Sequence, residues 1–500
     1  MRSSATRLLF VCLASLLALS ATGATLTGIV PAAAPHGARV VLTGSGLDAP
    51  DLAATFSDES GNAIVASIVA KSAKSAEVIV PYSAASGPVQ ASVSGAIIGT
   101  ASFTLLLDPA FTSVRTLAVS DKSNDVFKAL GGVALEPNGT VVIADTAHNV
   151  VATMAPGAAP VVLAGTWSKS GYADGAGAQA LFKQPFGIAY DATQNVIYVA
   201  DTGNNTIRRV AADGTVSTLA GNGQSGSADG VGTAAQFKAP QAIALDANGN
   251  LFVADTGNSE IRVVTPSGVV STLTGSVHSG FADGALSRAL YNAPGGIALD
   301  RDGAIYVADA GNNRIRKIAN GSVTTIAGTA QQGWVDGPAA FAQFKLPGGV
   351  AVDEAGNVYV SDTANNVIRL ISGGSVSTIA GNGKQGLIDG SPLAASFKAP
   401  AGLAFGGGVF VADSGNDAVR LLVPELKFSA VYPASGPSAG GNSVRLFGSG
   451  FINGLTSVAV NGANVGATFV TSTELLIPSM PAGTGTANIA ITTPAGTVQL

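Results

Sequence analysis

One phrase recurs through the chain at a nearly constant period. "VADTGNNTIRRV" begins at Val199, "VADTGNSEIRVV" at Val253 and "VADAGNNRIRKI" at Val307. Aligned on its acidic residue, the phrase occurs six times, at successive spacings of 56, 54, 54, 53 and 51 residues. The six acidic residues are Asp145, Asp201, Asp255, Asp309, Asp362 and Asp413. A constant period of this length is typical of a propeller or a solenoid, in which each repeat is one supersecondary unit.

Each period divides into four short apolar runs separated by turns. In the second period the runs are 186–191, 196–201, 206–211 and 216–221. The joints between them are rich in Gly, Asn and Asp, as tight hairpin turns require. Helical repeats are excluded, because no segment shows an apolar period of about 3.6 residues. The pattern predicts an all-β protein in which four antiparallel strands form each repeat, and such a unit is one propeller blade.

The last period lacks its fourth run. No counterpart of "VSTLAG" (216–221) follows Asp413, whereas "SVRTLAVS" (113–120) stands before the first period without a blade of its own. We therefore expect residues 113–120 to complete the sixth blade. This arrangement closes the ring and leaves no free sheet edge at the junction.

These repeats resemble the NHL family. The likeness is carried by the "GIALD" strand, the "VYVADTGNNRIR"-like phrase and the "STIAGNG" strand, over about residues 113–425. It implies a six-bladed β-propeller. The C-terminal stretch "VYPASGPSAGGNSVRLFGSGF" (431–451) resembles an IPT/TIG domain, which implies an immunoglobulin-like β-sandwich. A piece near the N-terminus follows the same plan more loosely. The expected domains are a divergent IPT/TIG-like sandwich (25–110), the propeller (111–425) and a second IPT/TIG-like sandwich (426–500).

Residues 1–24 have the pattern of a secretory signal peptide. A basic start leads into an apolar run (8–19), and small residues end at Ala24. The apolar run is short for a membrane span of about 20 residues. Cys12, the only cysteine, lies in this segment, so a cleaved chain would have neither disulfides nor a thiol nucleophile. We expect a secreted protein, extracellular, cell-surface or periplasmic, without a membrane span after cleavage.

The repeated phrase reverses the chain between the second and third strands. Gly and Asn tolerate the positive φ that such a turn needs, and Asp and Thr can bond to nearby backbone amides. In five blades an arginine follows the Asp after seven residues. These arginines are Arg208, Arg262, Arg316, Arg369 and Arg420. Because every blade demands these residues, we interpret them as a structural turn with a blade-internal ion pair. A ring of equivalent weak ligand contacts is the alternative.

A lysine precedes the innermost strand in five of the six blades. The five are Lys128, Lys183, Lys238, Lys345 and Lys398. Such a ring at the mouth of the central channel could attract an anion. Each long insert between blades also carries an aspartate. These are Asp174, Asp229, Asp283, Asp336 and Asp389. The simplest expectation is that the two sets pair and cancel.

The long inserts differ from blade to blade, and we expect them to bind a partner. Topology places them on the face of the phrase turns, with both flanking domains at the opposite, short-turn face. Function collects on loops over a rigid scaffold, and Trp and Tyr are favoured as contact anchors. The candidate contact residues are Trp167, Tyr172, His278, Phe281, Gln332 and Trp334. The alternative is that they only cap the blades.

The residues do not favour an enzyme. Related amidating lyases bind a metal in the channel through several histidines, but here only His36, His148 and His278 occur. They cannot form a three-histidine zinc site in one chain. Lactonase-like propellers hold Ca²⁺ through Asp, Asn and Glu, which leaves calcium open. A streptogramin-lyase-like site would need a histidine near the channel, so His148 is the one worth testing.

We therefore expect a non-catalytic binding scaffold, without a cofactor, for a protein or polysaccharide partner. A nucleic-acid partner is not expected: the net charge is -5, and such a partner needs a clustered basic face. Two alternatives remain. One is a propeller hydrolase or lyase with Ca²⁺ or another metal in its channel, and the other is a structural module of a larger surface protein.

Overall fold

The structure is a computed structural model. It describes residues 24–34, 38–58, 61–81, 84, 86–105, 110–120 and 125–499. Residues 1–23 of the expected signal peptide and His36 lie outside this part of the chain. The described residues form two compact units, which divide after Leu105. Within them, no helix has the length and apolar character needed to cross a membrane.

The first unit contains two β-sheets, and each sheet has one buried face. One sheet has the order β1 (Thr25–Val30), β3 (Arg39–Ser45), β7 (Ser75–Ile79), β6 (Ile68–Ser72). The other has the order β2 (Ala33–Ala34), β9 (Ala96–Leu105), β8 (Gly87–Val93), β4 (Ala53–Ser57), β5 (Ala63–Val65). In β7 and β8 buried and more exposed residues alternate, as in a strand that covers a core on one side.

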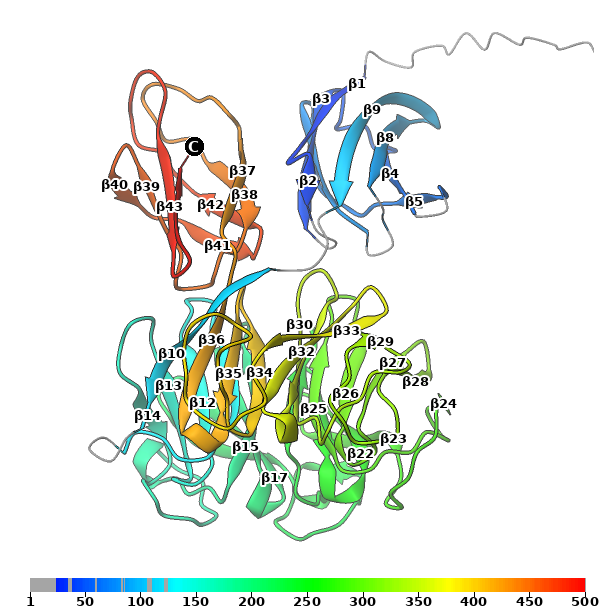
Figure 1. Ribbon diagram of the computed structural model, residues 1–500, viewed down its shortest axis with the longest axis vertical. Helices are drawn as coiled ribbons and strands as arrows, with labels where there is room; N and C mark the ends of the chain where they lie inside the picture. The colour runs from blue at the N-terminus through cyan, green and yellow to red at the C-terminus, as the bar shows by residue number, and fades with distance from the viewer. Residues whose placement is uncertain are drawn as a thin grey trace, which may run out of the picture. The chain divides into compact units, whose positions relative to one another are not determined.

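The second unit begins with six four- or five-stranded antiparallel sheets, which are the blades of a β-propeller (Figure 1). Blade 1 consists of β11 (Leu130–Leu135), β12 (Val141–Asp145), β13 (Val150–Met154) and β14 (Val161–Ala164). Blade 2 consists of β15 (Pro185–Asp191), β16 (Val196–Asp201), β17 (Thr206–Ala211) and β18 (Val216–Ala220). Blade 3 consists of β20 (Ala242–Leu245), β21 (Leu251–Asp255), β22 (Glu260–Val264) and β23 (Val269–Gly275).

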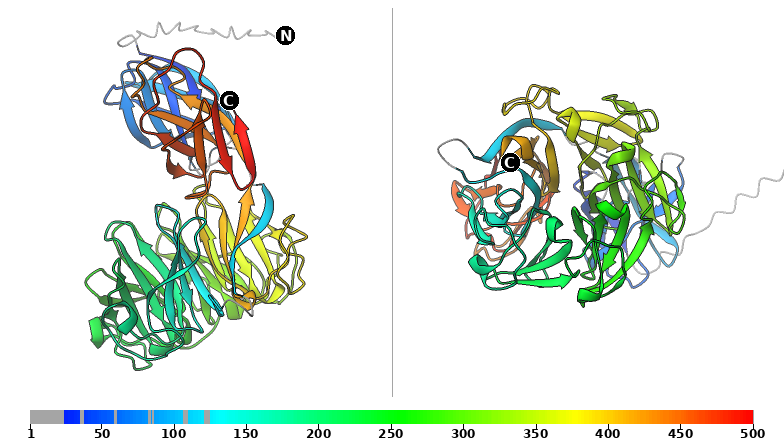
Figure 2. Two further views of the ribbon diagram at one scale, coloured as in Figure 1. Left: turned by 90° about the vertical axis from the view of Figure 1, so that its left-hand side faces the viewer. Right: turned by 90° about the horizontal axis from the view of Figure 1, so that it is seen from below.

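The remaining blades follow the same order from the centre outward. Blade 4 consists of β25 (Pro294–Leu299), β26 (Ile305–Asp309), β27 (Arg314–Ala319) and β28 (Ser322–Ala327). Blade 5 consists of β30 (Gly349–Val352), β31 (Val358–Asp362), β32 (Val367–Ser372) and β33 (Ser375–Ala380). Blade 6 consists of β34 (Pro400–Phe405), β35 (Val409–Asp413), β36 (Ala418–Pro424) and β10 (Phe111–Val119). The inner strands of neighbouring blades contact one another all round the ring (Figure 2). The prediction of an all-β, six-bladed propeller is confirmed.

Blade 6 takes its outermost strand from the other end of the propeller sequence. β10 pairs antiparallel with β36, and Val114 lies opposite Leu422. The Ala129 N–H, at the start of blade 1, donates to Asp417 Oδ1 of blade 6 at 2.7 Å. Residues of blades 1 and 6 also share one apolar core, for example Val133 and Phe410. The two ends of the ring are therefore joined by strand pairing, a side-chain hydrogen bond and packing.

The long inserts run around the rim of the ring. Three of them contain a two-residue strand that pairs with the outer strand of the blade that follows. These strands are β19 (Gly230–Val231), β24 (Gly284–Ala285) and β29 (Gly337–Pro338), which pair with β23, β28 and β33. Bridges between Gly175 and Val216 and between Gly390 and Val114 do the same for blades 2 and 6. The inserts thus cover the outer sheet edges, which would otherwise invite pairing with another chain.

Two further sheets follow blade 6. One has the order β37 (Lys427–Tyr432), β38 (Val444–Ser449), β42 (Glu474–Ile477), β41 (Thr468–Thr471). The other has the order β40 (Ala463–Val465), β39 (Ser457–Val460), β43 (Ile489–Thr493), β44 (Gly496–Gln499). Leu446 and Leu475 of the first sheet share a core with Val458 and Ile491 of the second.

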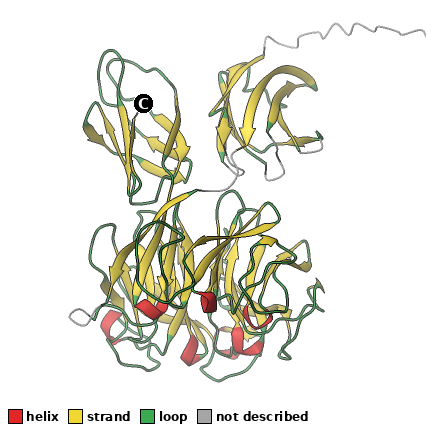
Figure 3. Cartoon of the chain, in the orientation of Figure 1, coloured by secondary structure: helices red, strands yellow, loops and turns green. Residues whose placement is uncertain are grey.

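This C-terminal region contacts the short turns of the propeller. Asn453 Nδ2 donates to Glu136 O at 3.0 Å, and Ser472 Oγ donates to Glu354 Oε2 at 3.0 Å. Glu136 and Glu354 both lie in turns between the first and second strands of a blade. The short 3-10 turns of the repeated phrase, drawn red in Figure 3, connect the second and third strands.

Candidate functional site

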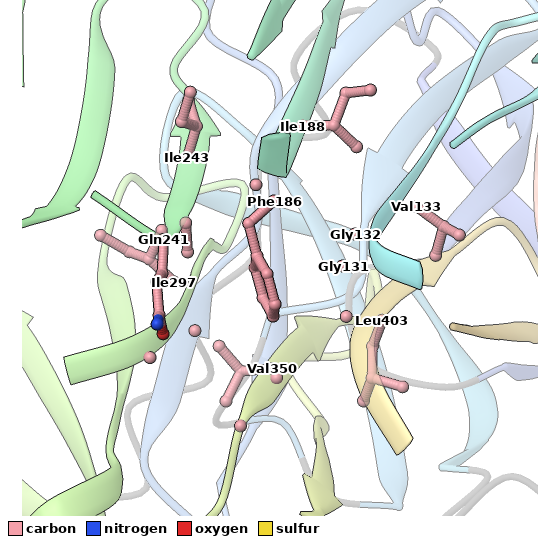
Figure 4. A pocket seen from close by; sticks show the side chains of 17 residues that line it. Gly131, Gly132, Val133, Phe186, Ile188, Gln241, Ile243, Ile297, Val350 and Leu403 are labelled. Carbon is pink, nitrogen blue, oxygen red and sulfur yellow. The ribbon is translucent and has the colours of Figure 1, made fainter. Parts of the chain in front are cut away.

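The central channel is narrow and apolar. Its lining comes from the inner strands of the six blades, and its volume is about 50 Å³. Six aliphatic side chains surround it: Val133, Ile188, Ile243, Ile297, Val350 and Leu403. Figure 4 shows the Phe186 ring reaching toward the middle, with Gln241 beside it. A space of this size holds a few water molecules at most, whereas ligand pockets measure about 300–1,000 Å³.

Glycines keep the channel narrow. A Cβ on Gly402 would lie 2.7 Å from the Gly132 Cα of the next blade, and one on Gly296 would lie 2.7 Å from Gly348 O. Such contacts leave no space for a side chain, so neighbouring inner strands meet backbone to backbone. The repeated glycine of the "GIALD" strand therefore serves blade packing.

The side chains that line the channel do not fit a calcium site. They include no Asp, Asn, Glu or His, and Gln241 is their only polar side chain. Calcium takes six to eight oxygen ligands, among which carboxylates are prominent. Across the described parts of the chain, no group of three or more His, Cys, Asp or Glu side chains is placed to hold a metal.

The repeated Asp–Arg pair belongs to a buried three-residue cluster. In blade 3, Arg262 Nη1 donates to Asp255 Oδ2 at 3.0 Å and Arg262 Nη2 donates to Asp229 Oδ1 at 2.6 Å. The Arg262 and Asp255 side chains are fully buried, whereas Asp229, from the insert, is half-exposed. Arg262 also lies over the Phe237 ring at 5.3 Å. The cluster recurs in blades 2, 4, 5 and 6.

The expected pairing of the insert aspartates with the lysines is wrong. All five aspartates bind the arginine of their own blade, because the insert folds back against the outer strand. Partial burial raises the pKa of Asp229, but hydrogen bonds from Arg262 and Thr272 hold it below its usual value. Burial raises the pKa of Asp255, although Lys238 N–H, Asn258 and Arg262 oppose this.

The turn itself ties each blade to the next. In blade 2, Thr202 Oγ1 donates to Pro240 O at 2.6 Å, and Asn205 Oδ1 accepts the Ala239 N–H at 2.9 Å. Both partners lie at the start of blade 3. Asn205 has a φ of 53°, a left-handed conformation that Asn tolerates. The repeated phrase therefore forms a structural turn that links each blade to the next.

The five lysines lie exposed on the face of the 3-10 turns. A Cβ on Gly203 would lie 2.6 Å from Lys183 Cγ, so the lysine stem crosses the turn of its own blade. None of the five lines the channel. Among the residues that the structure describes, no carboxylate lies within 4.0 Å of their ammonium groups.

Three of the candidate contact residues cover the buried clusters. Tyr172 OH lies 3.1 Å from Thr218 Oγ1, and its ring lies 5.1 Å from the Arg208 Cζ. The Phe281 ring and Trp334 occupy the same position of their own inserts, each with more than 40% of its surface exposed. They therefore cap their blades and present one side to solvent. They are spread around the ring, as are the exposed His278 and Gln332.

Blade 1 departs from this pattern. His148 stands at the place of the turn Asn, and Ala152 at the place of the Arg. His148 Nδ1 lies 2.8 Å from Asp145 Oδ2, and its Nε2 lies 3.4 Å from Asp125 Oδ2. Trp167, the remaining candidate contact residue, stacks on the imidazole at a centroid distance of 4.0 Å. Burial raises the pKa of Asp145, against the opposing effect of His148. His148 is buried in blade 1 and does not line the channel.

Comparisons with known proteins agree on the propeller. Residues 53–275 match the family described as SMP-30/Gluconolactonase/LRE-like region, and residues 291–318 match the NHL repeat. SUPPRESSOR OF QUENCHING 1, chloroplastic, from Arabidopsis thaliana is 30% identical over 307 residues, which cover 57% of this chain and 29% of that protein. NHL repeat-containing protein 2 from Gallus gallus is 28% identical over 353 residues, 61% of this chain and 48% of that protein.

The chain therefore spans less than half the length of these curated relatives. A solved structural genomics protein of unknown function from Bacteroides thetaiotaomicron VPI-5482 aligns with a TM-score of 0.53 at 20% identity. The alignment covers 80% of this chain and 98% of that one. These likenesses support the six-bladed β-propeller fold of the SMP-30/gluconolactonase-like and NHL-repeat proteins, and fold alone does not imply function.

Proposed function

We propose that this protein is a secreted or cell-surface binding protein without a catalytic site, whose propeller presents its long inserts to a protein or polysaccharide. The observation that carries the proposal is the channel, which has a volume of about 50 Å³ and no titratable side chain in its lining. A catalytic site in the channel would need space for a substrate and reactive side chains, and a channel without either favours binding on the outer surface.

The long-insert face has the properties of a contact surface. Tyr172, Phe281 and Trp334 each expose 43–46% of their surface. Tyr172 and Phe281 lie against arginines, and Trp334 Nε1 donates to Thr378 Oγ1 at 2.7 Å. Rings held in this way lose little conformational entropy on binding, which favours affinity. The five exposed lysines lie around the same face and would attract acidic groups.

We assign the flanking regions a spacer or attachment role. The two-sheet regions 25–105 and 427–499 are compatible with the IPT/TIG-like sandwiches that the sequence resembles. With the expected signal peptide directing secretion, these regions would act as spacers or attachment modules for the propeller outside the cell.

Glycan-array and pull-down measurements on residues 25–500 test the proposal. We expect partners of the wild type to bind about tenfold or more weakly to a Tyr172→Ala/Phe281→Ala/Trp334→Ala variant. Because these rings also cap the clusters, a second variant changes only exposed lysines: Lys183→Glu/Lys238→Glu/Lys345→Glu. A matched control, Val269→Ser, lies at the short-turn end of blade 3, outside both proposed binding surfaces. Unchanged affinity in both face variants would contradict the proposal.

A melting experiment tests the enzyme alternative. The melting temperature is measured with EDTA and then with Ca²⁺, Mg²⁺ or Zn²⁺ added. A ligand that binds only the folded state raises this temperature by mass action. We expect no shift with any of the metals, and a saturable rise would favour the metal-dependent alternative.

A further inference from the structure

A ligand-sized cavity lies between blades 1 and 2, at the end of the blades opposite the 3-10 turns. Its volume is about 400 Å³, within the range of small-molecule sites. The turn between β13 and β14 (155–160) forms one wall, and the turn between β15 and β16 (192–195) forms another. Leu163, Ile197 and Val210 form an apolar floor.

The cavity is open because blade 1 has short side chains on the side that faces blade 2. Thr153 lines the cavity, whereas the corresponding residues of blades 2, 4 and 5 are the longer Arg209, Lys317 and Leu370. The turn between β13 and β14 contributes only small side chains, Ala155, Ala158 and Ala159.

Glu136 lines the cavity because it departs from the repeat. The corresponding residues Asp191, Asp246, Asp300 and Asp353 all accept backbone N–H groups of their own turns. In blade 1, Asn138 Oδ1 does this instead, by accepting the Thr140 N–H at 2.8 Å. The Glu136 carboxylate, which accepts Asn138 Nδ2 at 3.2 Å, is thereby released to line the cavity.

Tyr190 and Asn195 depart from the repeat in the same place. Tyr190 stands where Leu245 and Leu299 occur in the next two blades, and its hydroxyl donates to Asn195 Oδ1 at 2.7 Å. Asn195 itself stands where other blades have a glycine with positive φ, such as Gly249 and Gly303. Three exceptions to the repeat therefore meet at one cavity, whereas features common to all blades serve the fold.

The side chains that line the cavity indicate which class of ligand it would bind. The 14 lining residues include a carboxylate, an amide, a phenol and the hydroxyls of Thr140 and Thr153, but no Lys, Arg or His. An anionic ligand would meet Glu136 without a counter-charge. Hydroxyl groups can both donate to Glu136 and accept from Asn195, and an aliphatic floor suits the C–H faces of a sugar ring.

We propose that this cavity is a binding site for a neutral carbohydrate of about one or two sugar rings. Glu136 and Asn195 would bind its hydroxyl groups, and Tyr190 would contact its ring. The site is separate from the long-insert face, so it does not depend on the function proposed above. The Asn453 side chain of the C-terminal region binds Glu136 O and holds this wall of the cavity in place.

Isothermal titration of residues 25–500 tests the site. The ligands are neutral mono- and disaccharides (glucose, galactose, mannose, N-acetylglucosamine, maltose and cellobiose), with gluconate as an anion and glucosamine as a cation. We expect at least one neutral sugar to bind in the micromolar to millimolar range. Glu136→Gln and Tyr190→Leu should each weaken it by about tenfold. Leucine is the residue of neighbouring blades, so the second variant is expected to fold.

Two further variants complete the test. Ala158→Trp fills the cavity and should abolish binding, while Tyr172→Ala on the opposite face should leave it unchanged. No binding of any neutral sugar, binding of glucosamine or gluconate alone, or full affinity in the three cavity variants would each overturn the proposal. Loss of the long-insert partner in Tyr172→Ala with intact sugar binding would separate this site from the proposed function.

Discussion

Blade 1 and blades 2 to 6 share their strands but not their buried charges. Five blades bury an arginine between two aspartates, while blade 1 places the imidazole of His148 between Asp145 and Asp125. In both cases the turn aspartate is fully buried and has a basic partner. Every blade therefore supplies a basic partner for this carboxylate, and an arginine is only one way to supply it.

Blade 1 also departs from the repeat at the end opposite the 3-10 turns. There Thr153 replaces the longer side chains of blades 2, 4 and 5, Glu136 replaces the aspartate of the turn between the first and second strands, and a cavity opens toward blade 2. Where a blade has the residues common to the repeat, these residues pack in the same way as in the other blades. The blade that departs from it is where the surface gains room for a ligand.

The largest loss of stability is expected when the buried Asp–Arg–Asp cluster of one blade is broken. Arg262→Met leaves Asp255 buried without a cation, which typically costs about 3–5 kcal/mol of unfolding free energy. Urea denaturation measures this cost. Arg115→Met, at an exposed position of β10, is the control and should change stability by less than about 0.5 kcal/mol. Equal stability of the two variants would contradict a structural role for the cluster.

The free energy of unfolding should depend on pH because of Asp353, the buried aspartate in the turn between the first and second strands of blade 5. Burial raises the pKa of Asp353 from near 3.8 to about 6, and the charge of Glu354 adds to this. Its stabilising contribution is therefore complete below pH 3.8 and is lost as the pH rises through 6. Between pH 4 and 7 the wild type should lose up to about 3 kcal/mol relative to Asp353→Asn.

Denaturation at a series of pH values measures this difference. Asp213→Asn is the control, because hydrogen bonds from Thr215 hold the pKa of Asp213 below its usual value and its contribution is constant above pH 4. A pH-independent difference between wild type and Asp353→Asn would show that Asp353 is not protonated in the folded state.

A smaller effect is expected from giving blade 1 the turn residue of the other blades. His148→Asn removes the imidazole from Asp145 without supplying an arginine, and Trp167 loses its stacking partner. We expect a loss of about 1–3 kcal/mol, measured by urea denaturation. His278→Asn, at an exposed insert position, should be neutral. If His148→Asn were neutral as well, the imidazole would not replace the arginine.

The smallest expected effect is a gain in stability. Blade 4 has Ala310 where blades 1, 2, 3 and 5 have a threonine whose hydroxyl binds the next blade. Ala310→Thr should reach Pro347 O and stabilise the propeller by about 0.5–1.5 kcal/mol. Ala310→Val has the same shape without the hydroxyl and is the matched control. A thermal melt that ranks the two variants equally would rule out the hydrogen bond as the cause.

Strand pattern, turn residues and blade number could be predicted, because they depend on local sequence. Gly, Asn and Asp at regular spacing define the hairpins, and the period counts the blades. The partner of each insert aspartate could not be predicted in this way. Asp229 lies 33 residues from Arg262 and nine from Lys238, and only the fold of the insert decides between them.

The sequence by itself thus determined an all-β ring of six repeats, since turn chemistry and strand periodicity act over a few residues. The tertiary structure decided the rest. It closed the channel through backbone contact between glycines, laid the inserts along the outer edges, and brought Glu136, Tyr190 and Asn195 to one cavity. These features depend on the distance between neighbouring blades, which no single repeat encodes.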